Sequence, residues 1–314
     1  MSRWDIHDAA QRRQSEASPV RQEPQTEPDS RVLTGRNGAG DQPSAALPQP
    51  SETQRRTTDA RAPERRVEHR DRGRAYALRD SEMTAMSDIG RFRTVDSKDL
   101  QRFVYGGDAA RMNRDLESLR GQGLIEEKTI FRAHKQARRV VTLTDVAHRI
   151  IRKTGALPRD QKIYHGFVKP REIHHDADLY RVYEQAAAKI QETGGRPLRV
   201  RLDFELKALV QREKQAVKDR PEAEQRARLA VLAERHGLVL QGSTVHVPDV
   251  QLEYESRDKE IARENLELVS ENYRSAGIQS KAASGFTLYA RGNDAARVRR
   301  ALSDTHAVGR ILST

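Results

Sequence analysis

Acidic side chains on two neighbouring predicted strands are the residues of this sequence best suited to chemistry. Within residues 246–291, apolar and polar side chains alternate over 247–254 and again over 261–269, and a short polar turn joins the two runs into a hairpin. Asp249 and Glu267 are then expected to face each other across the hairpin. Two such carboxylates can hold a hard divalent cation and orient water beside a phosphate. They indicate metal-dependent phosphodiester hydrolysis.

The elements around this hairpin carry the other groups that such a site needs. The spacing of apolar residues predicts a helix over 272–283 and an interior strand over 286–289. Lys281 on that helix is the candidate to stabilise charge or to position the attacking water. Asp203, at the end of an earlier predicted strand over 198–204, is the candidate third metal ligand. The expected metal is Mg²⁺.

A structural interpretation of the same acids stays open, in which they are solvated or paired in salt bridges. Glu184, on a helix predicted from a cap at Asp176 to Glu192, is a further acid that could join the site. His174 and His175 are adjacent and therefore point in different directions, so capping or packing is favoured over metal binding. A highly charged helical pair, broken at Pro221, is predicted between the strands.

A helix-turn-helix is predicted closer to the N-terminus. Asp108 and Thr144 stand where N-caps are expected, each directly before a run with helical periodicity. A glycine turn separates the second and third helices, which is the order of helix-turn-helix proteins. The pattern predicts helices over 80–89, 97–104, 109–122 and 145–153, with strands over 124–130 and 140–143 between the last two.

Basic residues on the third helix and on the turn between the two strands are candidates for DNA contacts. The helix would enter a major groove while the turn touches phosphates or the minor groove. The alternative is that this domain binds protein and that its arginines are solvated. The candidate residues are Arg111, Arg114, Arg120, Arg132, Lys135, Arg138 and Arg139.

Composition points to an anionic partner. The 314 residues carry a formal net charge of +11, which favours nucleic acid. Residues 1–74 are rich in Arg, Pro and Gln without apolar periodicity, so we expect a disordered arm. The absence of cysteine excludes a disulfide framework and thiolate chemistry. With neither a signal peptide nor a spanning apolar run, a cytoplasmic protein without membrane contact is expected.

Two parts of the chain resemble known families. Winged-helix domains of bacterial regulators and mobile-element proteins are similar to the sequence DLESLRGQGLIEEKTI with RRVVTLTDVAHRII. The pair Pro248 and Asp249, with Glu267 on the next strand, resembles the PD-(D/E)XK core of restriction-endonuclease-like nucleases. That family places its lysine two residues after the second acid, whereas Val269 stands there in this sequence and Lys281 would have to replace it.

The combination resembles replication-relaxation proteins of plasmids and integrative elements. The resemblance implies an α+β chain with a disordered arm (1–74), a winged helix-turn-helix domain (75–155), a linker (156–173) and a nuclease-like α/β domain with a mixed sheet and a helical insertion (174–314). It implies a DNA-binding accessory protein in replication, relaxation or conjugative transfer, with double-stranded DNA and a relaxase or replication protein as partners. The alternatives are an active Mg²⁺-dependent endonuclease and a winged-helix transcriptional repressor. The sequence does not fix the oligomeric state.

Overall fold

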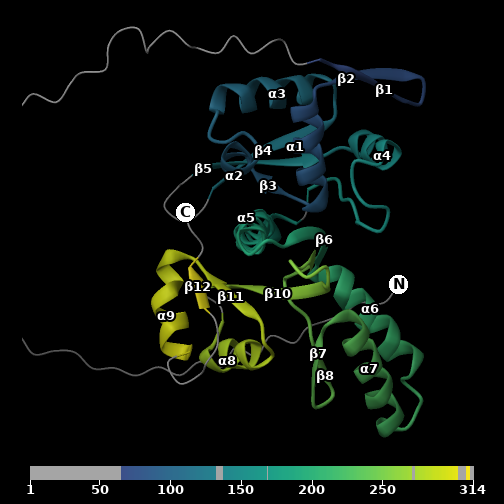
Figure 1. Cartoon of the computed structure of the whole chain (residues 1–314), viewed down its shortest axis with the longest axis vertical. Helices are drawn as coiled ribbons and strands as arrows, with labels where there is room; N and C mark the ends of the chain where they lie inside the picture. Colours follow the sequence, from purple (N-terminus) through teal and green to yellow (C-terminus); the bar gives the residue numbers. More distant parts are fainter. Residues whose placement is uncertain (1–64, 132–136, 168, 271–272, 303–308, 312–314) are drawn as a thin grey trace, which may run out of the picture. The chain divides into compact units, whose positions relative to one another are not determined.

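The chain is an α+β protein with one mixed sheet and several smaller antiparallel ones (Figure 1). No helix among the described residues combines the length and the apolar character needed to cross a membrane. The computed structural model describes residues 65–131, 137–167, 169–270, 273–302 and 309–311.

The described part begins with a hairpin that the sequence did not predict. Strands β1 (Val67–Asp71) and β2 (Arg74–Leu78) pair antiparallel, so residues 67–74 do not belong to a disordered arm. Asp71 anchors the hairpin, because its buried carboxylate accepts hydrogen bonds from Arg149 Nε at 2.9 Å and Lys153 Nζ at 2.6 Å. This tertiary contact orders a segment whose composition alone indicates disorder.

The next elements follow the predicted order closely. Asp108 and Thr144 cap their helices as expected, since their side chains accept hydrogen bonds from the backbone N–H of Arg111 and Ala147. Strands β4 and β5 form an antiparallel hairpin, and β3 pairs with the other edge of β5. The elements are α1 (Asp80–Arg91), β3 (Val95–Asp96), α2 (Ser97–Phe103), α3 (Ala109–Gly121), β4 (Ile125–Phe131), β5 (Ala137–Leu143) and α4 (Asp145–Thr154).

Residues 155–167, here called the strap, lead from α4 toward α5 (Pro170–Glu192). The helix begins at Pro170, so the predicted cap at Asp176 is wrong. Asp176 lies inside α5, where its Oδ2 is 3.6 Å from Arg93 Nε. Proline suits the first helical turn because its missing N–H has no partner to lose there. Helix α5 contacts α2 and β3 as well as β6, β9 and β10. It therefore packs against both the three-stranded sheet, which contains β3, and the five-stranded sheet, which contains β6, β9 and β10.

The largest sheet has five strands in the order β6–β9–β10–β11–β12. Strand β9 is antiparallel to both of its neighbours, β6 and β10, whereas β10, β11 and β12 run parallel to one another and are connected through α8 and α9. Figure 1 shows both helices beside these parallel strands. The elements are β6 (Arg196–Leu202), β9 (Val250–Glu255), β10 (Ile261–Val269), α8 (Ser275–Ala283), β11 (Thr287–Ala290), α9 (Gly292–Leu302) and β12 (Gly309–Ile311).

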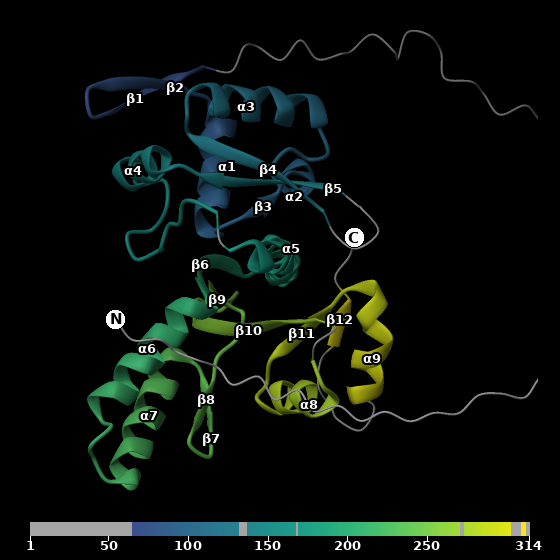
Figure 2. The same cartoon turned by 180° about the vertical axis from the view of Figure 1, so that it is seen from behind.

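An insert separates β6 from β9 in sequence. It contains the predicted helical pair, α6 (Asp203–Ala216) and α7 (Glu222–His236), and an unpredicted hairpin of β7 (Val239–Gln241) and β8 (Thr244–His246), which lie together in Figure 2. The insert has its own buried apolar cluster, made by Leu206, Val210, Leu229, Ala233, Leu238 and Val245. Its two ends meet, because Asp203 N donates to Asp249 O at 3.0 Å.

Candidate functional site

Asp249 and Glu267 lie opposite each other across the β9–β10 hairpin, as the alternation predicted. Val250 pairs with Leu266, so the residues one step further on each strand come together. Asp249 N donates to Glu267 Oε2 at 3.2 Å, and Leu268 N donates to Asp249 Oδ2 at 2.9 Å. The backbone of each strand thus holds the carboxylate of the other.

Lys281 reaches this pair from α8. Its Nζ lies 2.9 Å from Glu267 Oε1 and donates a hydrogen bond to Val247 O at 2.8 Å. Tyr273, which the sequence reasoning missed, donates its hydroxyl hydrogen to the same Glu267 oxygen. We call Asp249, Glu267, Lys281 and Tyr273 the carboxylate cluster.

The environment of Glu267 favours its protonated form. The residue is 1% exposed, and burial together with the charge of Asp249 raises the pKa of its carboxyl to about 7, against the opposing effects of Lys281 and Tyr273. Both oxygens accept hydrogen bonds from protein groups. A metal ion at Glu267 would have to displace at least one of them.

The other residues near the cluster are arranged differently from the prediction. Asp203 contributes its backbone N–H to Asp249, while its carboxylate pairs with Lys207 Nζ at 2.5 Å. His175 Nε2 lies 3.6 Å from Asp249 Oδ1. Burial opposes protonation of His175, but Asp249 and the nearby aspartates outweigh it and raise its pKa. Asp203 is therefore a backbone support of this site, with its side chain committed elsewhere.

A pocket of about 750 Å³ opens beside the carboxylate cluster. Lys207 and Lys281 line it, together with the apolar side chains of Phe204, Val245 and Val247. The two lysines are those that neutralise Asp203 and Glu267. Lys281 therefore belongs to both the carboxylate cluster and the lining of the pocket.

The predicted DNA-contacting arginines divide into exposed and buried ones. The side chains of Arg114 and Arg120 on α3 are 55% and 60% exposed, and Arg111 is half-buried. Arg139 on β5 is half-buried and donates from Nη2 to Asn113 Oδ1 at 2.6 Å, which joins β5 to α3. Arg132 and Lys135 lie outside the described residues.

Arg138 does not fit the predicted role. It is 8% exposed, its Nε donates to Asp96 Oδ2 at 2.6 Å, and its Nη1 lies 3.0 Å from Asp178 Oδ1. A guanidinium buried between two carboxylates is not presented to a phosphate. Arg138 was predicted on the basic turn, but it lies within β5, and the alternation along this strand turns it inward.

The β1–β2 hairpin adds exposed arginines next to α3. Arg66 Nη2 donates to Ser118 Oγ at 3.3 Å, and Ala77 exchanges hydrogen bonds with the side chain of Gln122. Arg70, Arg72 and Arg74 are exposed on the same hairpin. The sequence signal was present, since these residues close the arginine-dense arm, but the hairpin itself was not predicted.

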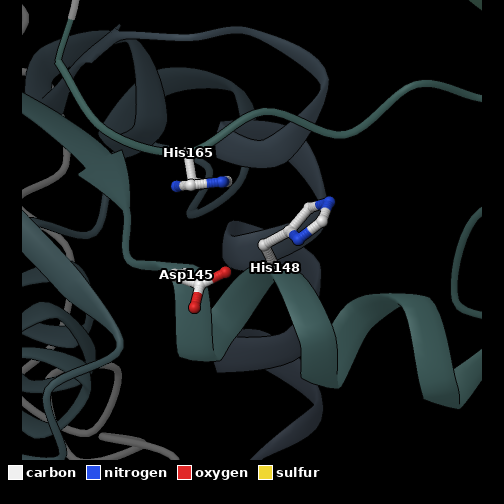
Figure 3. Close-up of side chains that lie close together, drawn as sticks. All are labelled: Asp145, His148 and His165. Atoms are coloured by element: carbon white, nitrogen blue, oxygen red, sulfur yellow. The ribbon is translucent and has the colours of Figure 1, made fainter.

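A second cluster could hold a metal ion. In the part of the chain that the structure describes, the group with three suitable ligands consists of Asp145, His148 and His165. Figure 3 shows Asp145 and His148 on α4 with His165 on the strap facing them. Asp249, Glu267 and Asp203 do not make such a three-ligand group. The available sequence signal was the i, i+3 spacing of Asp145 and His148.

Comparison with known proteins adds no identification: no family model, curated protein or solved structure matches this chain.

Proposed function

We propose that this chain is a duplex-DNA-binding accessory protein of a plasmid or integrative element, acting in replication, relaxation or conjugative transfer. The observation that carries the DNA-binding part is the basic surface around α3. Three arginine-bearing elements, α3, the β1–β2 hairpin and β5, are joined there by side-chain hydrogen bonds through Arg66, Gln122 and Arg139. The assignment to a mobile element rests on the sequence resemblance.

The element order supports a winged-helix interpretation of residues 75–155. A short helix precedes the basic helix α3, and the β4–β5 hairpin follows it in the position of a wing. In this proposal α3 lies in the major groove, and the exposed arginines of the β1–β2 hairpin extend the contact along flanking phosphates. A nuclease-like interpretation of residues 174–314 is supported by the mixed sheet with its acids on adjacent strands.

Salt-dependent binding tests the proposal. In Arg114→Gln and Arg120→Gln, each loss of one phosphate contact should weaken binding to duplex DNA and lower the slope of log K against log salt by about 1. Arg212→Gln, at an exposed position of α6, is the matched control and should change neither the affinity for DNA nor its salt dependence. Equal weakening in the control, or affinity independent of salt, contradicts the proposed surface.

The choice of DNA separates this function from a repressor. An accessory protein should prefer the transfer or replication origin of its element, whereas a winged-helix repressor should prefer its own promoter. Competition between the two fragments, labelled in turn and measured by fluorescence anisotropy, gives the order of affinities. Preference for the promoter would replace the proposed role by transcriptional repression.

An active Mg²⁺-dependent endonuclease is the second candidate. The observation that favours it is the 2.9 Å contact between Lys281 Nζ and Glu267 Oε1, which brings all three predicted catalytic residues together. Asp249 and Glu267 would hold the Mg²⁺, which polarises the phosphate when bound. Lys281 would stabilise developing charge. The accessory role stands first because Glu267 already accepts two hydrogen bonds from protein groups and pairs with Lys281.

Plasmid nicking tests this second candidate. Supercoiled plasmid carrying the native neighbourhood is incubated with the protein and Mg²⁺, Mn²⁺ or EDTA, beside Asp249→Ala/Glu267→Ala. Nicking that needs the metal and is lost in the variant would establish an enzyme. Retained binding without nicking would leave the carboxylate cluster a structural role.

A further inference from the structure

Three potential metal ligands converge where α4 begins. The ligand atoms of Asp145, His148 and His165 all lie within 4.8 Å of one another, and the two imidazole rings are 5.1 Å apart between centroids. In a tetrahedral zinc site, ligand atoms 2.0–2.1 Å from the metal are about 3.4 Å from each other. Side-chain rotations that move each ligand atom by about 1 Å are therefore enough for all three residues to reach one ion.

Backbone hydrogen bonds hold the segments that bear these residues in place. Thr144 N donates to Leu124 O at 3.0 Å, and its side chain caps α4, which fixes the turn bearing Asp145 and His148. On the strap, both neighbours of His165 are tied by backbone hydrogen bonds, Tyr164 N to Gly90 O at 2.7 Å and Gly166 N to Leu143 O at 2.9 Å. Such preorganisation lowers the entropic cost of binding.

We infer that Asp145, His148 and His165 form a binding site for a borderline transition metal ion, with Zn²⁺ as the ligand of choice. Two imidazoles and one carboxylate suit Zn²⁺, Co²⁺ or Ni²⁺ and disfavour Mg²⁺, which takes oxygen ligands. Figure 3 shows Asp145 and His148 on α4 and His165 on the strap, so an ion held by all three would bridge two segments. This site goes beyond the proposed DNA binding and is separate from the carboxylate cluster.

Neighbouring charges determine what metal binding would change. Arg149 pairs with Asp145 and also with Asp71, where Nη2 lies 2.9 Å from Oδ2. When the metal takes the Asp145 carboxylate, Arg149 keeps its pair with Asp71, and the β1–β2 hairpin stays anchored. The positive charges of Arg149 and Arg152 weaken the attraction of a cation, so the affinity should be lower than in a structural cysteine site.

A bound ion would fasten the first turn of α4 to the strap. The strap is the only covalent connection between α4 and α5, and Gln161 also ties it to β6 through two 3.0 Å hydrogen bonds with Val200. Metal binding should therefore protect strap amides around His165 from hydrogen exchange. It should also raise the melting temperature, with the stabilisation growing as the logarithm of the free Zn²⁺ concentration over Kd.

The test titrates Zn²⁺ and Co²⁺ into the metal-free full chain. Isothermal titration should give one Zn²⁺ site, and Co²⁺ should show visible d–d bands of a nitrogen- and oxygen-ligated ion. In His148→Gln and His165→Gln, Zn²⁺ affinity should fall more than about tenfold, which even loss of a supporting residue produces at metal sites. The Zn²⁺-dependent rise in melting temperature should disappear with it.

Two matched controls locate the ion. His174→Gln/His175→Gln removes the other neighbouring pair of histidines, and Asp249→Asn/Glu267→Gln removes the paired acids of the carboxylate cluster. Both should keep the Zn²⁺ site. Loss of binding in either control, or unchanged binding in both His148→Gln and His165→Gln, overturns the inference. Far-ultraviolet circular dichroism of each variant excludes misfolding as the cause.

Discussion

Buried carboxyl groups in this chain differ in pKa because their partners differ. Hydrogen bonds from Arg149 and Lys153 lower the pKa of Asp71 to about 2. Burial raises the pKa of Glu184 on α5 to about 8, and the charge of Asp88 adds to the rise although Arg91 opposes it. Glu184 therefore interacts with Asp88 and Arg91 on α1. It is not part of the carboxylate cluster, which was one of the predicted possibilities.

Replacing Glu184 should change how the stability of the protein depends on pH. The folded-state pKa lies above the ordinary 4.5, so its stabilising contribution is complete at low pH and is lost as pH rises through about 8. Glu184→Gln mimics the protonated form, so its melting temperature relative to wild type should rise from pH 5 to pH 9. The pKa rise from 4.5 to about 8, at about 1.4 kcal/mol for each pKa unit, corresponds to a change of roughly 4–5 kcal/mol in the free energy of unfolding.

Thermal unfolding of both proteins at several pH values measures this difference. Glu192→Gln, on an exposed position of the same helix, is the control and should show no such trend. A Glu184→Gln difference that stays constant with pH would mean that this carboxyl ionises alike in the folded and unfolded chains.

The residues of the carboxylate cluster were predictable where strand alternation determined them. Asp249 and Glu267 follow from the pairing of two strands, and Lys281 from the helix that must come next. Tyr273 was missed, and His175 was assigned to capping or packing instead of to Asp249, because a loop and a distant helix bring these residues in and no local pattern encodes such contacts. His165 was missed for the same reason, since it is separated from Asp145 and His148 by the rest of α4 and most of the strap.

Helix boundaries were predictable where a local side chain makes the cap. Asp108 and Thr144 mark helix starts through hydrogen bonds to nearby backbone groups, which depend only on neighbouring residues. The helix predicted over 80–89 continues through Gly90 to Arg91, and Gly90 is buried. It permits close packing, because an added Cβ would lie 2.9 Å from Ile163 Cγ2 and 3.0 Å from Leu143 Cδ1.

Gly90→Ala should therefore destabilise the protein despite the higher helix propensity of alanine. Crowding against the strap and β5 should cost about 1–3 kcal/mol, more than the roughly 1 kcal/mol that alanine gains in a helix. Gly121→Ala in α3 is the matched variant, since nothing lies within 4 Å of its added Cβ, and it should be neutral or stabilising. Urea unfolding compares the two, and equal effects would argue against close packing at Gly90.

Buried ion pairs join α5 to both sheets. Asp178 lies 3.0 Å from Arg138 Nη1 on β5 and accepts from Arg291 Nε, just after β11, at 2.9 Å. Arg181 on the same helix donates to Asp99 on α2 at 2.8 Å. Charges buried in this way are costly when one partner is removed, because the remaining charge stays desolvated.

Asp178→Asn should accordingly lower the free energy of unfolding by about 3–5 kcal/mol. It should also weaken the coupling between residues 80–154 and the five-stranded sheet, so that urea unfolding followed by circular dichroism and by tyrosine fluorescence no longer coincides. Asp160→Asn removes an acid whose side chain is 64% exposed in its pair with Arg199 and should cost less than about 1 kcal/mol. Coincident transitions in Asp178→Asn would show that other contacts suffice.

The insert between β6 and β9 is a place where the chain should tolerate changes in length. Leu202 and Val250 are paired neighbours in the sheet. Residues 203–249 therefore connect two adjacent antiparallel strands whose ends are close enough for a two-residue turn to join them. The apolar cluster of the insert is its own, so the residues between Asp203 and Asp249 should be replaceable while the strand order and both aspartates are kept. A fluorescent protein or an affinity tag grafted between α6 and α7 would likewise leave the strands undisturbed.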